Sequence, residues 1–212
     1  MASLDKLTYF GAHARAGPIR MLYALAGVRL EDHIVKHEEW IPVKAALPLG
    51  QVPVFKCEEG RLLMSKAIVR YVAKKFGFVG ATSWDEAMND MLVEVCSDCF
   101  EDINQKVYFW MLFERFPKPD DADKVKENIK ANIIKSMNFI EAVAKKRGKN
   151  FILDDKISLA DVWLYSFLEF GLVAFPELMD VTPWIREFVE KFKNEARVKT
   201  YLAVRRPSHL KI

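Results

Sequence analysis

A tyrosine and a serine stand where the chain changes from one predicted element to the next. Tyr9 closes a short apolar segment, where its hydroxyl could donate to a developing anion or its ring could simply pack at the core. Ser65 opens a predicted helix, which it could cap by accepting a backbone N–H bond. The same helix end carries a partial positive charge and could instead hold a carboxylate. The local sequence leaves both interpretations open for each residue.

Two further segments carry groups suited to an extended ligand. Gln51-Val52-Pro53 puts a proline at the start of a strand, where a cis bond would turn the Val52 backbone outward to pair with a ligand. A strand-entry proline without any ligand explains the same residues. Trp40 and Lys44 are four positions apart and would be neighbours on one helical turn, although Pro42 makes a loop equally consistent. The alternative for this pair is a packed indole beside a solvated lysine.

An aromatic run, Tyr108-Phe109-Trp110, is followed by Phe113 and Phe116. The run is apolar on all sides of a helix, so one buried face cannot accommodate all of it. We expect most of these rings to pack in the core and some to meet a partner, a ligand or another segment.

Short strands and helices alternate in the first 80 residues. Gly27 ends a helix that Pro18 opens, and Glu58-Glu59-Gly60 reads as a hairpin turn. Strands are predicted over 4–10, 29–35, 52–57 and 61–64, and helices over 18–26 and 65–76.

Beyond Gly80 the pattern becomes helical throughout, with segments at 84–115, 121–146, 158–173 and 183–194. Ser158 and Asp161 have the spacing of a capping box at the start of the third segment. The sequence therefore predicts an α/β domain over residues 1–80 followed by an all-helical domain over 81–212.

Composition excludes several classes of protein. Of 212 residues, 51% are hydrophobic, and 32 basic against 29 acidic residues give a net charge of +3 without a basic block, so nucleic acid is not expected as a partner. The sequence has no signal-like start and no run of about 18 apolar residues.

Cys57, Cys96 and Cys99 form no metal-ligand pattern with the histidines, so no metal is expected. Cys96 and Cys99 lie in a helical pattern, and reduced thiols in the cytoplasm fit better than redox chemistry.

In chain order these residues resemble the cytosolic glutathione transferases, most closely the sigma-like branch with the glutathione-dependent prostaglandin D synthases and the S-crystallins. The resemblance spans nearly the whole chain. It implies a thioredoxin-like domain, a helical domain and a homodimer. The segments that carry it are Leu7–Phe10, Arg15-Ala16, Pro18–Arg20, the Trp40 to Lys44 spacing, Gln51–Pro53, Ser65 with Ala67–Tyr71, Ser158–Asp161 and Arg205–Pro207.

The resemblance also implies roles for individual residues. Tyr9 donates its hydroxyl hydrogen bond to the glutathione sulfur and Arg15 adds positive field, while Phe10, Tyr108 and Trp110 line an apolar substrate site. The implied glutathione contacts are Trp40 and Lys44 on the glycine carboxylate, Gln51, Val52 and cis Pro53 at the cysteinyl backbone, Ser65 on the γ-glutamyl carboxylate, and Asp98 reaching the γ-glutamyl amine across the dimer.

The chain departs from the family pattern at three places. Met64 stands where relatives have a glutamine before the serine, and methionine cannot supply that side-chain hydrogen bond. The run His13–Gly17 lacks one arginine and one glutamate of the family motif. Glu94, Ser97 and Asp98 keep only part of the acidic cluster of the prostaglandin synthases, so metal-stimulated behaviour is not expected.

We expect from this resemblance a glutathione transferase that conjugates glutathione, its co-substrate, to hydrophobic electrophiles. Two alternatives stay open. A glutathione-dependent prostaglandin-type isomerase would use the same thiolate site with a different apolar pocket. A non-catalytic crystallin-like or ligand-binding member is suggested by Met64 and the altered His13–Gly17 run.

Overall fold

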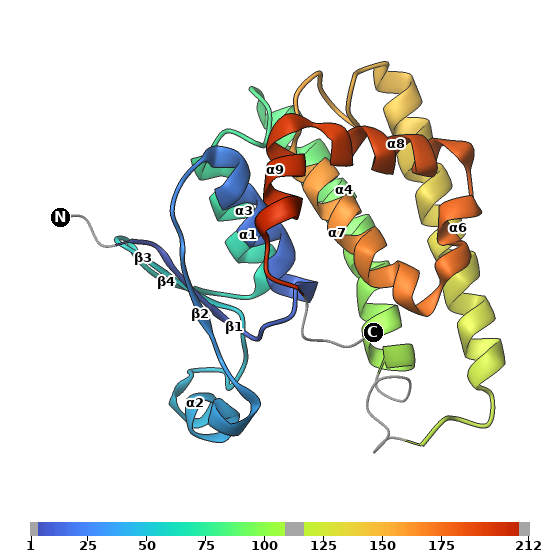
Figure 1. Cartoon of the computed structure of the whole chain (residues 1–212). Coiled ribbons are helices and arrows are strands. Elements are labelled where there is room, and N and C mark those ends of the chain that lie inside the picture. Colours follow the sequence, from blue (N-terminus) through green and yellow to red (C-terminus); the bar gives the residue numbers. More distant parts are fainter. Residues whose placement is uncertain (1–3, 109–116, 208–212) are drawn as a thin grey trace. The chain divides into compact units, whose positions relative to one another are not determined.

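The computed structural model describes residues 4–108 and 117–207 of the chain (Figure 1). Among these residues the chain forms two compact units. The first runs to Gly77 and takes up the chain again at Glu195, and the second runs from Phe78 to Asn194. The sequence had assigned everything after residue 80 to one helical domain, so the return of the last helix to the first unit is an addition to that division.

The first unit is built on a four-stranded mixed sheet in the order β2-β1-β3-β4. β1 pairs in parallel with β2, and the other two pairs are antiparallel. Leu7 and Phe55 face each other across β1 and β3, and both are fully buried. All four predicted strands are confirmed, as β1 (Lys6–Tyr9), β2 (Glu31–Ile34), β3 (Val54–Cys57) and β4 (Gly60–Leu63).

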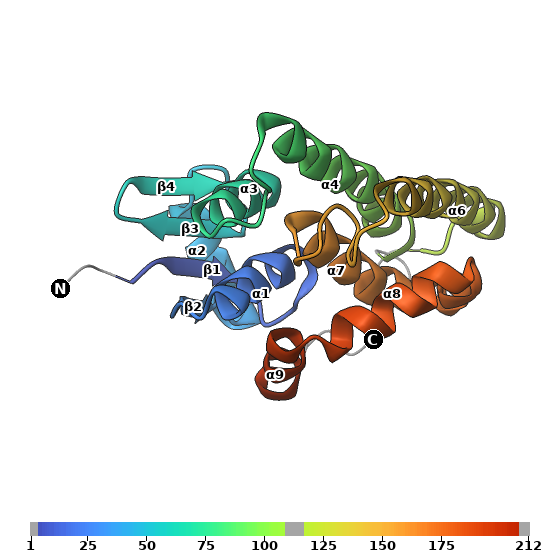
Figure 2. The ribbon, with the colours of Figure 1, turned by 90° about the horizontal axis from the view of Figure 1, so that it is seen from above.

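Helices lie on both sides of this sheet (Figure 1). In Figure 1, α1 and α3 lie on one side of it and α2 on the other, and Figure 2 shows α1 and α3 side by side. α1 begins with Pro18 in its first turn and ends at Gly27, which is left-handed with φ 69°. None of the residues of α2 is buried. The helices of this unit are α1 (Gly17–Ala26), α2 (Trp40–Ala46), α3 (Ser65–Lys75) and α9 (Ala196–Val204).

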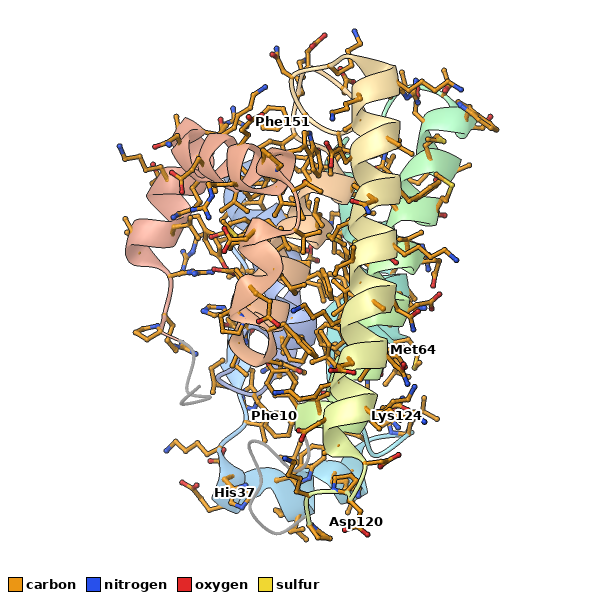
Figure 3. The ribbon with its side chains drawn as sticks, turned by 90° about the vertical axis from the view of Figure 1, so that its right-hand side faces the viewer. Phe10, His37, Met64, Asp120, Lys124 and Phe151 are labelled. Atoms are coloured by element: carbon orange, nitrogen blue, oxygen red, sulfur yellow. The ribbon has the colours of Figure 1, made fainter. Side chains whose placement is uncertain are left out.

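The second unit is helical in all of its described regular structure. The predicted segments at 121–146, 158–173 and 183–194 are confirmed as α6 (Ala122–Arg147), α7 (Leu159–Ala174) and α8 (Pro183–Asn194). α4 covers Ser83–Ile103 and continues in a π-helical turn, Asn104–Tyr108; the rest of the predicted 84–115 segment lies outside the described residues. Figure 3 shows α6 along its length, with Lys124 near its start and Phe151 beyond its end. None of the described helices is long and apolar enough to cross a membrane.

The predicted capping box at the start of α7 is confirmed and is fully buried at Asp161. The Ser158 N–H and hydroxyl donate to one Asp161 oxygen at 2.8 and 2.7 Å, and the Ile152 N–H donates to the other at 2.9 Å. Burial raises the pKa of Asp161 to about 6, and the hydrogen bonds from Ile152 and Ser158 oppose that rise. This carboxylate therefore joins the loop before α7 to the helix itself.

Replacing Asp161 with alanine should destabilise the protein strongly. The change leaves three buried donors on Ile152 and Ser158 unpaired, which should lower the free energy of unfolding by about 3 kcal/mol or more. Urea denaturation followed by circular dichroism measures this loss. Glu187→Ala, at an exposed position in the same unit, is the control and should change stability by less than about 0.5 kcal/mol.

Candidate active site

The strand register brings the predicted site segments to one edge of the sheet. Thr8 pairs with Val54, so Tyr9 at the end of β1 lies beside Pro53 at the start of β3. Val54 also pairs with Leu63, which places Met64 and the start of α3 on the other side of Pro53. Antiparallel pairing alone dictates this arrangement. Three segments far apart in the sequence thus meet at the same edge.

The end of β2 reaches the same edge. Tyr9 pairs with Ile34 in the parallel ladder, and the Val35 N–H donates to the Tyr9 carbonyl at 2.9 Å. The chain continues from there into α2, which carries Trp40 and Lys44. The segment that carries the predicted Trp40 and Lys44 is therefore connected directly to this edge.

Tyr9 is a rim residue of the core, only 6% exposed. Its ring lies 5.6 Å from that of Phe10, and the Phe10 ring meets Trp40 edge-on at 5.0 Å. These contacts join the end of β1 to α2 through aromatic packing. Phe10 and Trp40 are both half-buried, so part of each ring is accessible.

Arg20 holds the connection that follows Tyr9. From α1 its guanidinium donates to the carbonyls of Ala12 at 2.6 Å and Phe10 at 3.1 Å, and it binds both oxygens of Asp32 on β2 at 3.1 and 3.2 Å. The guanidinium carbon also lies 5.8 Å from the centre of the Tyr9 ring. Sequence reasoning gave Arg20 no role, although it is the one charged residue between Pro18 and Ala26 and could have been singled out on that ground.

The predicted Arg15 lies in a single 3-10 turn, Ala14–Ala16, directly before α1. The His13 carbonyl closes this turn by accepting from the N–H groups of Ala16 and Gly17 at 2.9 and 2.6 Å. Arg15 is half-buried. The altered His13–Gly17 run thus still forms an ordered entry into α1.

Trp40 and Lys44 do lie on one helix, which decides between the helix and the loop that Pro42 left open. Pro42 falls in the first turn of α2, where backbone N–H groups have no partner within the helix. The Lys44 side chain passes over Gly50, since a Cβ placed at Gly50 would lie 3.4 Å from both Lys44 Cγ and Cε. Lys44 thereby extends toward the segment that contains Gln51.

The predicted cis bond is confirmed between Val52 and Pro53. Pro53 is buried, Val52 is half-buried and Gln51 is exposed. Gln51 is therefore in contact with solvent, whereas Pro53 is fixed by packing in the core.

The start of α3 differs from the prediction. Ser65 is the first helical residue, and Met64, not Ser65, occupies the N-cap position, where it makes no side-chain cap hydrogen bond. The first turn also contains no acidic residue. The idea that Ser65 caps this helix is therefore wrong. The helix begins without a capping side chain from Met64 and with its partial positive charge unopposed by an acid.

Two non-glycine residues in the described part of the chain have positive φ, Ala14 at 29° and Met64 at 68°. Each directly precedes a predicted site residue, Arg15 and Ser65. Such backbone conformations cost about 1–3 kcal/mol each and gather where a ligand must be held. Met64 is also 59% exposed, so hydrophobic burial does not offset this cost.

The remaining predicted residues belong to the second unit. Asp98 is exposed on α4. Tyr108 is buried at 3% exposure, and its hydroxyl donates to the Phe170 carbonyl while their rings stack at 4.3 Å. Burial raises the pKa of Tyr108. These contacts favour a packing role for Tyr108 over its predicted place in a substrate wall. Trp110 lies outside the described residues.

Among the described residues, the thiols and metal-ligating groups form no second reactive centre. Cys57, Cys96 and Cys99 are free and buried, and burial raises the pKa of the last two above that of an ordinary thiol. Over residues 4–108 and 117–207, no group of three or more His, Cys, Asp or Glu side chains is placed to hold a metal ion.

Removing the Arg20 side chain should destabilise the first unit. Arg20→Met deletes the bonds to Phe10 and Ala12 and leaves Asp32 without its two-pronged partner, so we expect the free energy of unfolding to fall by about 3 kcal/mol. Arg29→Met removes an exposed arginine and should cost less than about 0.5 kcal/mol. Equal losses in urea denaturation would show that Arg20 has no special structural role.

The chain was compared with known proteins. Residues 101–205 match the family described as glutathione S-transferase, C-terminal domain. Glutathione S-transferase P of Caenorhabditis elegans is 30% identical over 197 residues, which cover 93% of this chain and 91% of the relative. The structure of a monomeric glutathione S-transferase from Necator americanus superposes with a TM-score of 0.86 at 28% identity, over 98% of this chain and 100% of that one. Prostaglandin synthase D of Nilaparvata lugens gives a TM-score of 0.82 at 26% identity, over 96% and 98%. The chain belongs to the glutathione S-transferase family, as its sequence predicted.

Proposed function

We propose that this transferase activates the thiol of glutathione and joins it to hydrophobic electrophiles. The observation that carries the proposal is the meeting of Tyr9, Pro53 and the acid-free start of α3 at one edge of the sheet. An extended tripeptide with a central thiol and a carboxylate at each end matches a site with a phenol in the middle and donors on both sides.

The chemistry at Tyr9 is thiolate stabilisation. A hydroxyl hydrogen bond to sulfur favours the ionised form, and lowering a thiol pKa by about two units takes about 2.7 kcal/mol. Arg15 contributes positive field nearby. The sulfur then attacks an electrophilic carbon, for example one that bears a halogen. A C–S bond forms, the carbon–halogen bond breaks, halide departs, and the thiol proton has already passed to solvent.

The ends of glutathione would be held by groups of opposite charge or by donors. Trp40 and Lys44 bind the glycine carboxylate, and the Val52 backbone pairs with the cysteinyl unit with help from Gln51. Ser65 and the first N–H groups of α3 bind the γ-glutamyl carboxylate, as anions commonly bind at helix starts. We also propose a homodimer, in which Asp98 of the partner subunit binds the γ-glutamyl amine.

The apolar substrate would lie against Phe10, whose ring is half-buried beside Trp40. We also propose Tyr108 and Trp110 for its wall. The likeness to an insect prostaglandin synthase makes a prostaglandin-type isomerase the second candidate. Such an isomerase would use the same thiolate, and glutathione would be released unchanged instead of remaining in the product. Three buried, free cysteines favour the cytoplasm as the location.

Removing the Tyr9 hydroxyl tests the mechanism. With glutathione and an activated aryl chloride at neutral pH, Tyr9→Phe should lose about 100-fold in kcat, because the thiol loses its main donor. The loss should shrink as the pH approaches about 9, where free thiols ionise unaided. Tyr71→Phe is the matched control, since Tyr71 lies in the same unit with its hydroxyl directed to Cys57 and Glu59. Equal pH profiles for wild type and Tyr9→Phe would refute the role of Tyr9.

Met64 allows a test of glutathione affinity. Met64→Gln supplies a side-chain hydrogen bond and should tighten glutathione binding about fivefold in calorimetry, the equivalent of about 1 kcal/mol. Met64→Leu keeps an apolar side chain and should bind as the wild type does. If the two variants bind alike, Ser65 and the α3 backbone already suffice. If neither variant nor the wild type binds glutathione, the non-catalytic alternative gains support.

A further inference from the structure

A cavity of about 290 Å³ lies within the first unit, away from the residues proposed to hold glutathione. Its walls come from the connection after β1, from α1, from β2 and from the end of α9. None of Tyr9, Trp40, Lys44, Pro53 or Ser65 lines it. The size is near the lower end of that of small-molecule sites, so it suits a compact ligand.

Part of the lining of this cavity is aliphatic. Ala24, Val28, Leu30 and Val204 line it, and Val28 and Val204 are 44% and 77% exposed at its rim. Leaving two valines in water at the mouth of a cavity forgoes the favourable burial of apolar surface. A ligand with an aliphatic body would cover them.

The charged residues of the cavity are mostly cationic. Arg20, Arg205 and Arg206 line it together with Asp32, a formal excess of two positive charges. Asp32 is already bound at 3.1–3.2 Å by Arg20, whereas Arg206 Nη1 reaches it only at 3.9 Å. That distance is too long for a hydrogen bond. Arg206 therefore keeps donor capacity for an anion at the edge of the cavity.

We propose that this cavity binds a small carboxylate with an aliphatic body, such as a medium-chain fatty acid. The carboxylate pairs with Arg206, and the chain lies against Val28, Leu30 and Val204. The Arg206 guanidinium selects an anion over a neutral or cationic ligand, and the aliphatic residues select it over inorganic anions. The site is separate from the glutathione and electrophile sites of the proposed function and does not depend on them.

Titration with [1-¹³C]octanoate, followed by the carboxyl NMR signal, tests the proposal on the full chain. S-hexylglutathione is present at saturation, so that the glutathione and electrophile sites are filled. We expect saturable binding that S-hexylglutathione does not change by more than about twofold, and at least about tenfold weaker binding in Arg206→Glu. Val204→Asp, at a highly exposed position, should weaken binding likewise by placing an anion at the rim.

Lys199→Glu is the matched control. Lys199 is exposed on α9, a few residues before Arg206, and does not line the cavity. The substitution changes the net charge by the same amount as Arg206→Glu, so the affinity of this variant for octanoate should stay within about twofold of the wild type. Octanol, which lacks the charge, should bind at least about tenfold more weakly than octanoate. Displacement of octanoate by S-hexylglutathione, equal losses in Arg206→Glu and Lys199→Glu, or the absence of saturable binding would each overturn the proposal.

Discussion

The pairing of β1, β3 and β4 is the constraint on which the candidate site depends. Because Thr8 faces Val54 and Val54 faces Leu63, the residues just beyond these positions must meet at one edge of the sheet. A shift of one residue in either pair would turn Leu7 or Phe55 out of the core, and both are fully buried. The hydrophobic core therefore fixes the site geometry, and the polar residues at the edge are positioned by burial elsewhere.

Arg20 extends this rigidity to the segment after Tyr9. A connection between a strand and a helix has few partners of its own, and its carbonyls would otherwise face solvent or a neighbouring cavity. One guanidinium bonds two of them and ties the segment to β2 through Asp32. The part-buried pair, in which the guanidinium binds both carboxylate oxygens, makes arginine hard to replace by lysine, which offers a compact charge without the planar fork. If this connection were flexible, the residues that follow Tyr9 would have a less well-defined position.

The sequence predicted what depends on local pattern. The four strands follow apolar runs between turns, α1 follows Pro18 and Gly27, and the Ser158–Asp161 box needs only a three-residue spacing. The missed features depend on contacts between distant residues. Neither the bond from Arg20 to Asp32 nor the return of α9 to the first unit has a signal within a short window. The helix start at Ser65 was misjudged because a serine before an apolar repeat looks the same at the N-cap and one residue later.

The unusual start of α3 links stability to binding. A side-chain cap typically stabilises a helix by about 1 kcal/mol, and a positive φ at a residue with a side chain costs about as much or more. At Met64 the chain has no side-chain cap and has a positive φ, and the Met64 side chain is 59% exposed. Neither choice helps folding, since an ordinary cap would satisfy the same N–H groups. Both leave the first turn of α3 open to an anion, which agrees with the carboxylate-binding role proposed for it.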